Sequence, residues 1–151
     1  MMDRRHVLSL SAAILATSFK RTAAQPANTG VPPMPGMANM EMTAKECIES
    51  CWQCHVVCLE TQLYCLDKGG AHASTAHISL MTDCAEMCLT TANAMLRRSS
   101  RHAAVCVACA EICDACAQAC EAFSGDATMV ACARSCRECA SHCRDISKRD
   151  I

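Results

Sequence analysis

Four stretches of the chain repeat apolar positions in steps that alternate between three and four residues, which is the period of an α-helix. They cover residues 44–67, 74–97, 101–123 and 127–146, and short turns containing glycine or serine separate them. No stretch shows the alternation of apolar and polar residues that is typical of a β-strand. Because helices of similar length joined by short turns pack as antiparallel neighbours, we predict an all-α fold, an antiparallel up-down-up-down four-helix bundle.

Cysteine fills most of the repeating positions. At about 100° per residue, the cysteines of one helix fall within an arc of roughly 60–80°, so each helix carries a stripe of thiols. Aromatic residues make up only 3% of the chain, so we expect the thiols rather than large side chains to fill the interior. The 16 cysteines are Cys47, Cys51, Cys54, Cys58, Cys65, Cys84, Cys88, Cys106, Cys109, Cys113, Cys116, Cys120, Cys132, Cys136, Cys139 and Cys143.

The second predicted helix has only two cysteines, and its stripe continues with other metal-binding side chains, His77, Met81 and Met95. Methionine on a helix stripe is ordinarily a core residue, but here its neighbours are thiols and histidines. Antiparallel helices would place His72, His77, Met81 and Met129 at one end of the bundle. The opposite end would gather Cys47, Met95, His102, Cys106, His142 and Cys143.

The first predicted helix also has an apolar face beside its thiol stripe. Ile48, Leu59 and Leu66 share this face, and Trp52 lies just beyond them. Trp52 and Tyr64 are side chains that suit a contact between subunits. We therefore expect a homo-oligomer, with packing against a helix of the same chain as the alternative.

The N-terminal residues are typical of an export signal. Arg4 and Arg5 precede a modest apolar run over residues 8–16, and small residues follow at 22–24. The arginine pair resembles a twin-arginine signal, with a general secretory signal as the alternative. The apolar run is too short for a permanent membrane span. We predict a signal peptide over residues 1–24, a periplasmic or otherwise exported mature chain, and no membrane segment in it.

A linker and a bundle should follow the signal. Residues 25–42 contain all four prolines and several methionines, so we predict a flexible linker there. Thr43 and Glu46 have the spacing of a capping box, which would start the first helix and assign residues 43–151 to the bundle. A formal net charge of -1 argues against a nucleic-acid partner. No pairing of a nucleophile with a base is evident, so we expect no enzymatic activity.

Four chemistries use this much sulfur. A disulfide scaffold fits an exported chain but not cysteines spaced along long helices. Iron–sulfur motifs wrap the cluster in a loop, commonly with proline after the last cysteine, and no cysteine here precedes proline. Zinc prefers separate, closed four-ligand sites. Cu(I) is selected by thiolate and thioether sulfur, so the thiols favour Cu(I), on the order of ten or more ions per chain.

The chain resembles the cysteine-rich four-helix-bundle copper storage proteins over about residues 43–146. The resemblance rests on the thiol stripes, on the sparser helix with Cys84 and Cys88, and on the exported N-terminus. The resemblance implies that all 16 cysteines are candidate Cu(I) ligands. It also implies an entrance lined by methionine and histidine, here His72, His77, Met81 and Met129, and an oligomer. The resemblance further implies that an exported member supplies or buffers copper for copper-dependent enzymes. The alternative is a periplasmic copper metallochaperone that receives copper from a donor and delivers one or a few Cu(I) to a partner.

Overall fold

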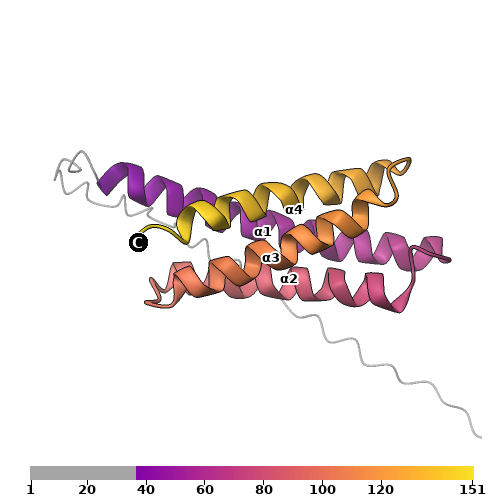
Figure 1. Cartoon of the computed structure of the whole chain (residues 1–151), viewed down its shortest axis with the longest axis horizontal. Helices are drawn as coiled ribbons and strands as arrows, with labels where there is room; N and C mark the ends of the chain where they lie inside the picture. Colours follow the sequence, from indigo (N-terminus) through magenta and orange to yellow (C-terminus); the bar gives the residue numbers. More distant parts are fainter. Residues whose placement is uncertain (1–36) are drawn as a thin grey trace, which may run out of the picture. The chain divides into compact units, whose positions relative to one another are not determined.

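The computed structural model describes the backbone from Met37 to Ile151 and the side chains from Ala44 onward. Four helices form this part of the chain: α1 (Met37–Lys68), α2 (Thr75–Leu96), α3 (His102–Glu121) and α4 (Ala127–Ile146). No strand occurs among the described residues. Each helix contacts the next in sequence, and α4 also contacts α1, so the helices surround one axis (Figure 1).

Contacts between α1 and α4 run in opposite order along the two helices. Cys47 near the start of α1 meets Cys143 near the end of α4, whereas Cys65 near the end of α1 meets Met129. Between α2 and α3, Met95 likewise meets Cys106. Neighbouring helices are therefore antiparallel, and the predicted all-α four-helix fold is confirmed.

The helix limits agree with the sequence pattern except at the start of α1. Helix α1 begins at Met37, so residues 37–42 of the predicted linker are helical. The capping-box interpretation of Thr43 and Glu46 is wrong, because both lie inside the helix. Between Gly36 and Gly69 the chain contains no glycine or proline, and the alanine, methionine and glutamate that follow Gly36 favour helix over termination. The predicted signal peptide and residues 25–36 of the linker lie outside the described residues.

At one end of the bundle, specific features of the α1–α2 and α3–α4 turns end α1 and start α4. Gly69 and Gly70 have φ angles of 72° and 60°, a left-handed conformation that suits glycine, and Gly69 N donates to Cys65 O at 3.0 Å to end α1. Asp126 caps α4, because its Oδ1 accepts hydrogen bonds from the backbone N–H groups of Thr128 and Met129 at 3.0 and 3.4 Å. The turns thereby fix where the thiol stripes begin and end.

Small side chains beside the thiol stripes allow the helices to approach closely. Three helices each carry a pair of buried alanines seven residues apart, directly after positions of the stripe. The pairs are Ala85 and Ala92, Ala110 and Ala117, and Ala133 and Ala140. Helix α3 is apolar and long enough to cross a membrane by length and composition, yet its cysteine face is buried against the rest of the bundle.

Candidate metal centre

All 16 cysteines point into the bundle. Each cysteine is 0% exposed, and each is a free thiol. No disulfide joins any pair, so the structure does not support a disulfide scaffold. Because a protonated thiol behaves as a small apolar group, the cysteines can serve as the hydrophobic core of the metal-free bundle.

The thiols form overlapping groups of four along the axis. Within each group all sulfur atoms lie within 4.8 Å of one another, and each successive group shares two cysteines with the one before it. In order from the start of α1, the groups are Cys51, Cys109, Cys139 and Cys143; Cys88, Cys109, Cys113 and Cys139; Cys54, Cys84, Cys88 and Cys113; Cys54, Cys58, Cys84 and Cys136; and Cys58, Cys116, Cys132 and Cys136. We call this arrangement the sulfur column.

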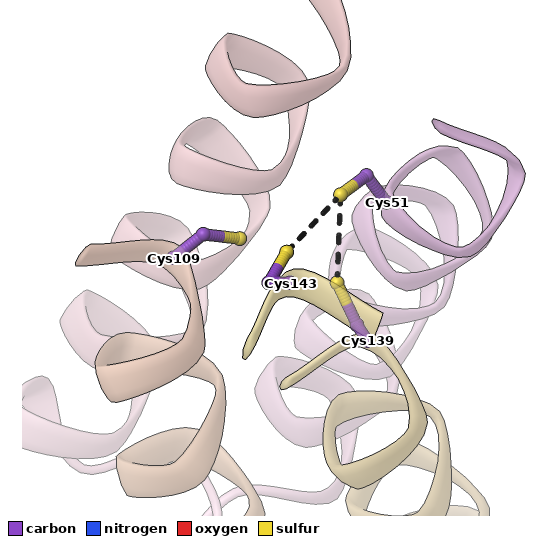
Figure 2. A group of neighbouring side chains, drawn as sticks. All are labelled: Cys51, Cys109, Cys139 and Cys143. Atoms are coloured by element: carbon purple, nitrogen blue, oxygen red, sulfur yellow. Dashed lines mark hydrogen bonds between the residues drawn. The ribbon is translucent and has the colours of Figure 1, made fainter. Parts of the chain in front are cut away.

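Figure 2 shows the first of these groups, to which α1, α3 and α4 contribute. Cys51 Sγ lies 3.7 Å from Cys143 Sγ and 3.7 Å from Cys139 Sγ, and Cys109 points toward them from the opposite side. Cys51 therefore meets residues 58 to 92 positions further along the chain in one small volume. A soft cation placed there would find thiols from several helices without any change of fold.

Neighbouring thiols hydrogen-bond to one another. Hydrogen bonds from several thiols lower the pKa of Cys109, and the largest contribution comes from Cys113, whose Sγ lies 3.9 Å from Cys109 Sγ. The same contact is the main cause that raises the pKa of Cys113. A thiolate in the column is thus stabilised by adjacent S–H groups, which then retain their own protons. At the end of the column, burial raises the pKa of Cys65. A metal ion must therefore displace protons from the thiols.

The end beside the α1–α2 and α3–α4 turns combines thiol, thioether and imidazole. The thiol of Cys65 donates to the Sδ atom of Met129 at 3.5 Å, and Met81 and Met129 are both buried. His77 is only 6% exposed, and its Nε2 atom has no hydrogen-bond partner. Burial lowers the pKa of His77, which keeps the ring neutral and leaves a lone pair for a metal.

His72 lies at the same end but contacts different groups. Its Nε2 atom lies 3.1 Å from Asp126 Oδ2, and its ring packs on Phe123 with 4.1 Å between the ring centroids. Tyr64 also donates to Asp126 Oδ2, at 2.8 Å, and Lys68 donates to the same oxygen. We call Tyr64, Lys68, His72 and Asp126 the Asp126 clamp. No pattern in the sequence predicts this clamp, because its members are separated by up to 62 residues and share no periodic signal.

The opposite end carries a second thiol–thioether contact. The thiol of Cys106 donates to Met95 Sδ at 3.8 Å, and Cys47 Sγ lies 3.8 Å from Cys143 Sγ. The contact with Cys143 lowers the pKa of Cys106, whereas the contact with Cys47 and burial raise it. Together these causes raise the pKa of Cys106 to about 12. The structure therefore brings sulfur of both kinds together at each end of the column, and Met95 lies at the end where the sequence analysis placed it.

The fold and the column together define a helical bundle lined by thiols for soft metal ions. A family model described as copper storage protein matches residues 40–148, so the chain belongs to the copper storage protein family. The predicted family is thus confirmed, and that family is named for storage rather than catalysis. A comparison with curated proteins gave no match.

Several solved structures share the fold. A protein from Nitrosospira multiformis is 42% identical, with a TM-score of 0.68, and the match covers 72% of this chain and 97% of that one. Cu(I)-bound copper storage protein BsCsp3 is 31% identical, with a TM-score of 0.65 and coverage of 70% and 98%. Apo copper storage protein 3 from Bacillus subtilis is also 31% identical, with a TM-score of 0.62 and coverage of 69% and 98%.

Proposed function

We propose that the bundle stores multiple Cu(I) ions along the sulfur column and binds them mainly through cysteine thiolates. The overlap of the four-thiol groups carries this proposal, because every group shares two sulfurs with the next. Separate closed zinc sites would each need their own four ligands. Cu(I) accepts fewer sulfur ligands, and a shared thiolate can bridge two ions, so a continuous column suits a chain of Cu(I) ions.

Charge balance explains how the column can both fold empty and fill with metal. The empty core is neutral while the thiols are protonated. Each incoming Cu(I) adds one positive charge and releases a proton from each thiol that it ligates. Thiolates shared between ions limit the buildup of buried negative charge. The column therefore favours clustered Cu(I) ions over isolated ones.

An anaerobic titration of the reduced protein with Cu(I), in the presence of a competing Cu(I) chelator, tests storage. We expect saturation on the order of ten ions per chain, from the number of thiols available. Saturation at one or two ions would contradict storage and support the metallochaperone alternative. A parallel thiol assay on the unfolded protein without reductant would confirm that the cysteines entered the titration as free thiols.

We also assign supporting metal ligands at the end beside the α1–α2 turn. His77, Met81 and Met129 lie buried there near Cys65, and the unpartnered Nε2 of His77 supports its role. His72 can join them through Nε2 only by leaving Asp126, which makes it a conditional ligand. X-ray absorption of the His77→Phe variant at low copper loading tests this assignment, because the nitrogen contribution should disappear.

The site of action is proposed to be the periplasm, reached through a twin-arginine signal in residues 1–24. The support is the Arg4–Arg5 pair and the short apolar run that follows it. Copper stored there would serve a copper-dependent enzyme. A reporter fused to residues 1–24 should be exported, and replacing both arginines with lysine should stop export. Continued export of the lysine variant would indicate the general secretory route.

The mature protein is proposed to be a homo-oligomer that pairs through α1. Five apolar side chains on this helix recur in steps of four and three and are 39% to 66% exposed: Trp52, Val56, Leu59, Leu63 and Leu66. We call them the α1 seam. Alternating steps of four and three are the pattern of a helix that packs lengthwise against another helix. A second copy of this chain offers a matching seam.

A further inference from the structure

The residues after α4, 147–151, turn back over one end of the bundle, and we call them the C-terminal strap. Arg149 N donates to Ile146 O at 3.0 Å, and Ile151 packs against the buried core. In Figure 1 the C-terminus lies at the same end of the bundle as the α2–α3 turn. This is the end at which Met95 meets Cys106 and Cys47 meets Cys143.

His102, the first residue of α3, fastens the strap. Its Nε2 atom lies 2.9 Å from the carbonyl oxygen of Arg149, and its Nδ1 atom lies 3.0 Å from the carbonyl oxygen of Ser99. The ring is only 8% exposed. A carbonyl can only accept a hydrogen bond, so Nε2 holds the carbonyl of Arg149 only while that nitrogen carries a proton. The strap is thus attached by a contact that can be given up without disturbing a helix.

The other end of the bundle is tied more extensively. The carboxylate of Asp126 accepts from side chains of α1 and the α1–α2 turn and from backbone N–H groups of α4. Phe123 fills the space between His72 and His77, with centroid distances of 4.1 and 5.3 Å. Opening that end would break contacts among three helices. Lifting the strap would break contacts of residues 147–151, which lie outside the helices.

We propose that the C-terminal strap is a movable cover that controls access to Cys47, Cys106 and Cys143, with His102 as its fastening residue. The proposal rests on the storage function, because it assigns a regulated opening to the same column. When the strap lifts, the sulfur atoms at this end meet solvent while all four helices stay in place. Removing the strap should therefore speed exchange at this end without lowering the number of ions stored.

Pulsed alkylation of the reduced, metal-free full chain tests the strap without reference to copper. Three variants are compared with the natural chain: a truncation after Ser147, His102→Ala and Lys148→Ala. The truncation keeps Ser147, the residue that follows α4, and Lys148→Ala is a control at an exposed position of the strap. Peptide mass spectrometry then gives a labelling rate for each cysteine. We expect truncation and His102→Ala to raise the rates at Cys47, Cys106 and Cys143 about tenfold, equivalent to about 1.4 kcal/mol of closing free energy.

The cysteines at the far end act as the internal control. Labelling of Cys65 and Cys120 should stay unchanged in both variants, and Lys148→Ala should behave as the natural chain does. Unchanged rates at the strap end would overturn the proposal, and so would an equal rise at both ends, which would indicate general loosening. Copper capacity is measured separately: a low capacity in the natural chain would contradict storage, whereas the alkylation pattern alone decides the role of the strap.

Discussion

The thioether sulfur of Met129 lies 3.5 Å from the thiol sulfur of Cys65, and both side chains are 0% exposed. Met95 and Cys106 make the equivalent contact at 3.8 Å at the other end. The column of thiols is therefore bounded at each end by a thioether. A thioether carries no proton to lose, so a mixed pair binds Cu(I) with less proton release than a pair of thiols does.

Replacing Met129 with leucine removes the sulfur and nearly conserves volume. A change of this kind in a core typically alters stability by less than about 1.5 kcal/mol. We expect Met129→Leu to fold normally and to bind about one Cu(I) fewer in a titration with a competing chelator, because one soft ligand is lost. The matched control is Met87→Leu, in a half-buried position of α2 outside the column, which should leave capacity unchanged. Equal capacity in the two variants would remove Met129 from the site.

Copper loading should acidify an unbuffered solution. Burial raises the pKa of Cys65, so this thiol is protonated at neutral pH and must give up its proton to bind a metal. Lowering the pH increases the competition from protons, so the affinity for Cu(I) should fall as pH falls, by about tenfold per pH unit for each proton displaced. A pH-stat record during anaerobic titration measures the release directly. Loading without proton release would mean that the empty column already holds thiolates.

The Asp126 clamp should stabilise the fold in a pH-dependent way. Lys68, followed by Tyr64 and the backbone N–H groups of α4, lowers the pKa of Asp126 below its ordinary value. A carboxyl group whose pKa is lowered by folding stabilises the folded state above its unfolded pKa of about 3.9, and this contribution disappears as pH falls through the folded pKa. Asp126→Asn should therefore lower the melting temperature at pH 7, and the difference should shrink in acid.

The control for the clamp is Asp67→Asn. Asp67 is exposed on α1 and forms no ion pair within the described part of the chain. Its replacement should change the melting temperature little at any pH. A difference between the natural chain and Asp126→Asn that persists unchanged at pH 2 would assign the effect to lost helix capping rather than to charge.

The cysteine positions predicted both the fold and the column, because one residue type marks the inward face of every helix. Steps of three and four residues locate that face within a helix, and the short turns leave few ways to pack four such faces. The stripe even continues where cysteine is replaced: Thr61 and Thr91 occupy buried positions in register with their neighbours. Burial at these two positions follows the helical period even though the residue type has changed.

Contacts between distant turns were beyond the reach of that pattern. The family resemblance implied that His72 lines an entrance, and nothing in the sequence indicated that its Nε2 atom contacts Asp126, 54 residues away. The start of α1 was placed too late because Thr43 and Glu46 have the spacing of a cap, and that local signal was outweighed by the helix formers before it. The contacts of His72 and the start of α1 both depend on competition between interactions. No single sequence motif predicts the result of that competition.

A charge in the middle of the α1 seam should separate the subunits of the proposed homo-oligomer. Leu63 is 66% exposed and lies between Leu59 and Leu66, so glutamate at this position meets solvent in a monomer but would be buried in a paired seam. Burying an unpaired carboxylate costs several kcal/mol, enough to dissociate an interface of moderate affinity. We expect Leu63→Glu to convert the oligomer to a monomer by light scattering while the melting temperature of the bundle and its Cu(I) capacity stay close to those of the natural chain. Val130→Glu, at an exposed apolar position on α4 outside the seam, is the matched control and should not change the assembly. An oligomer that survives Leu63→Glu would place the subunit contact elsewhere on the bundle.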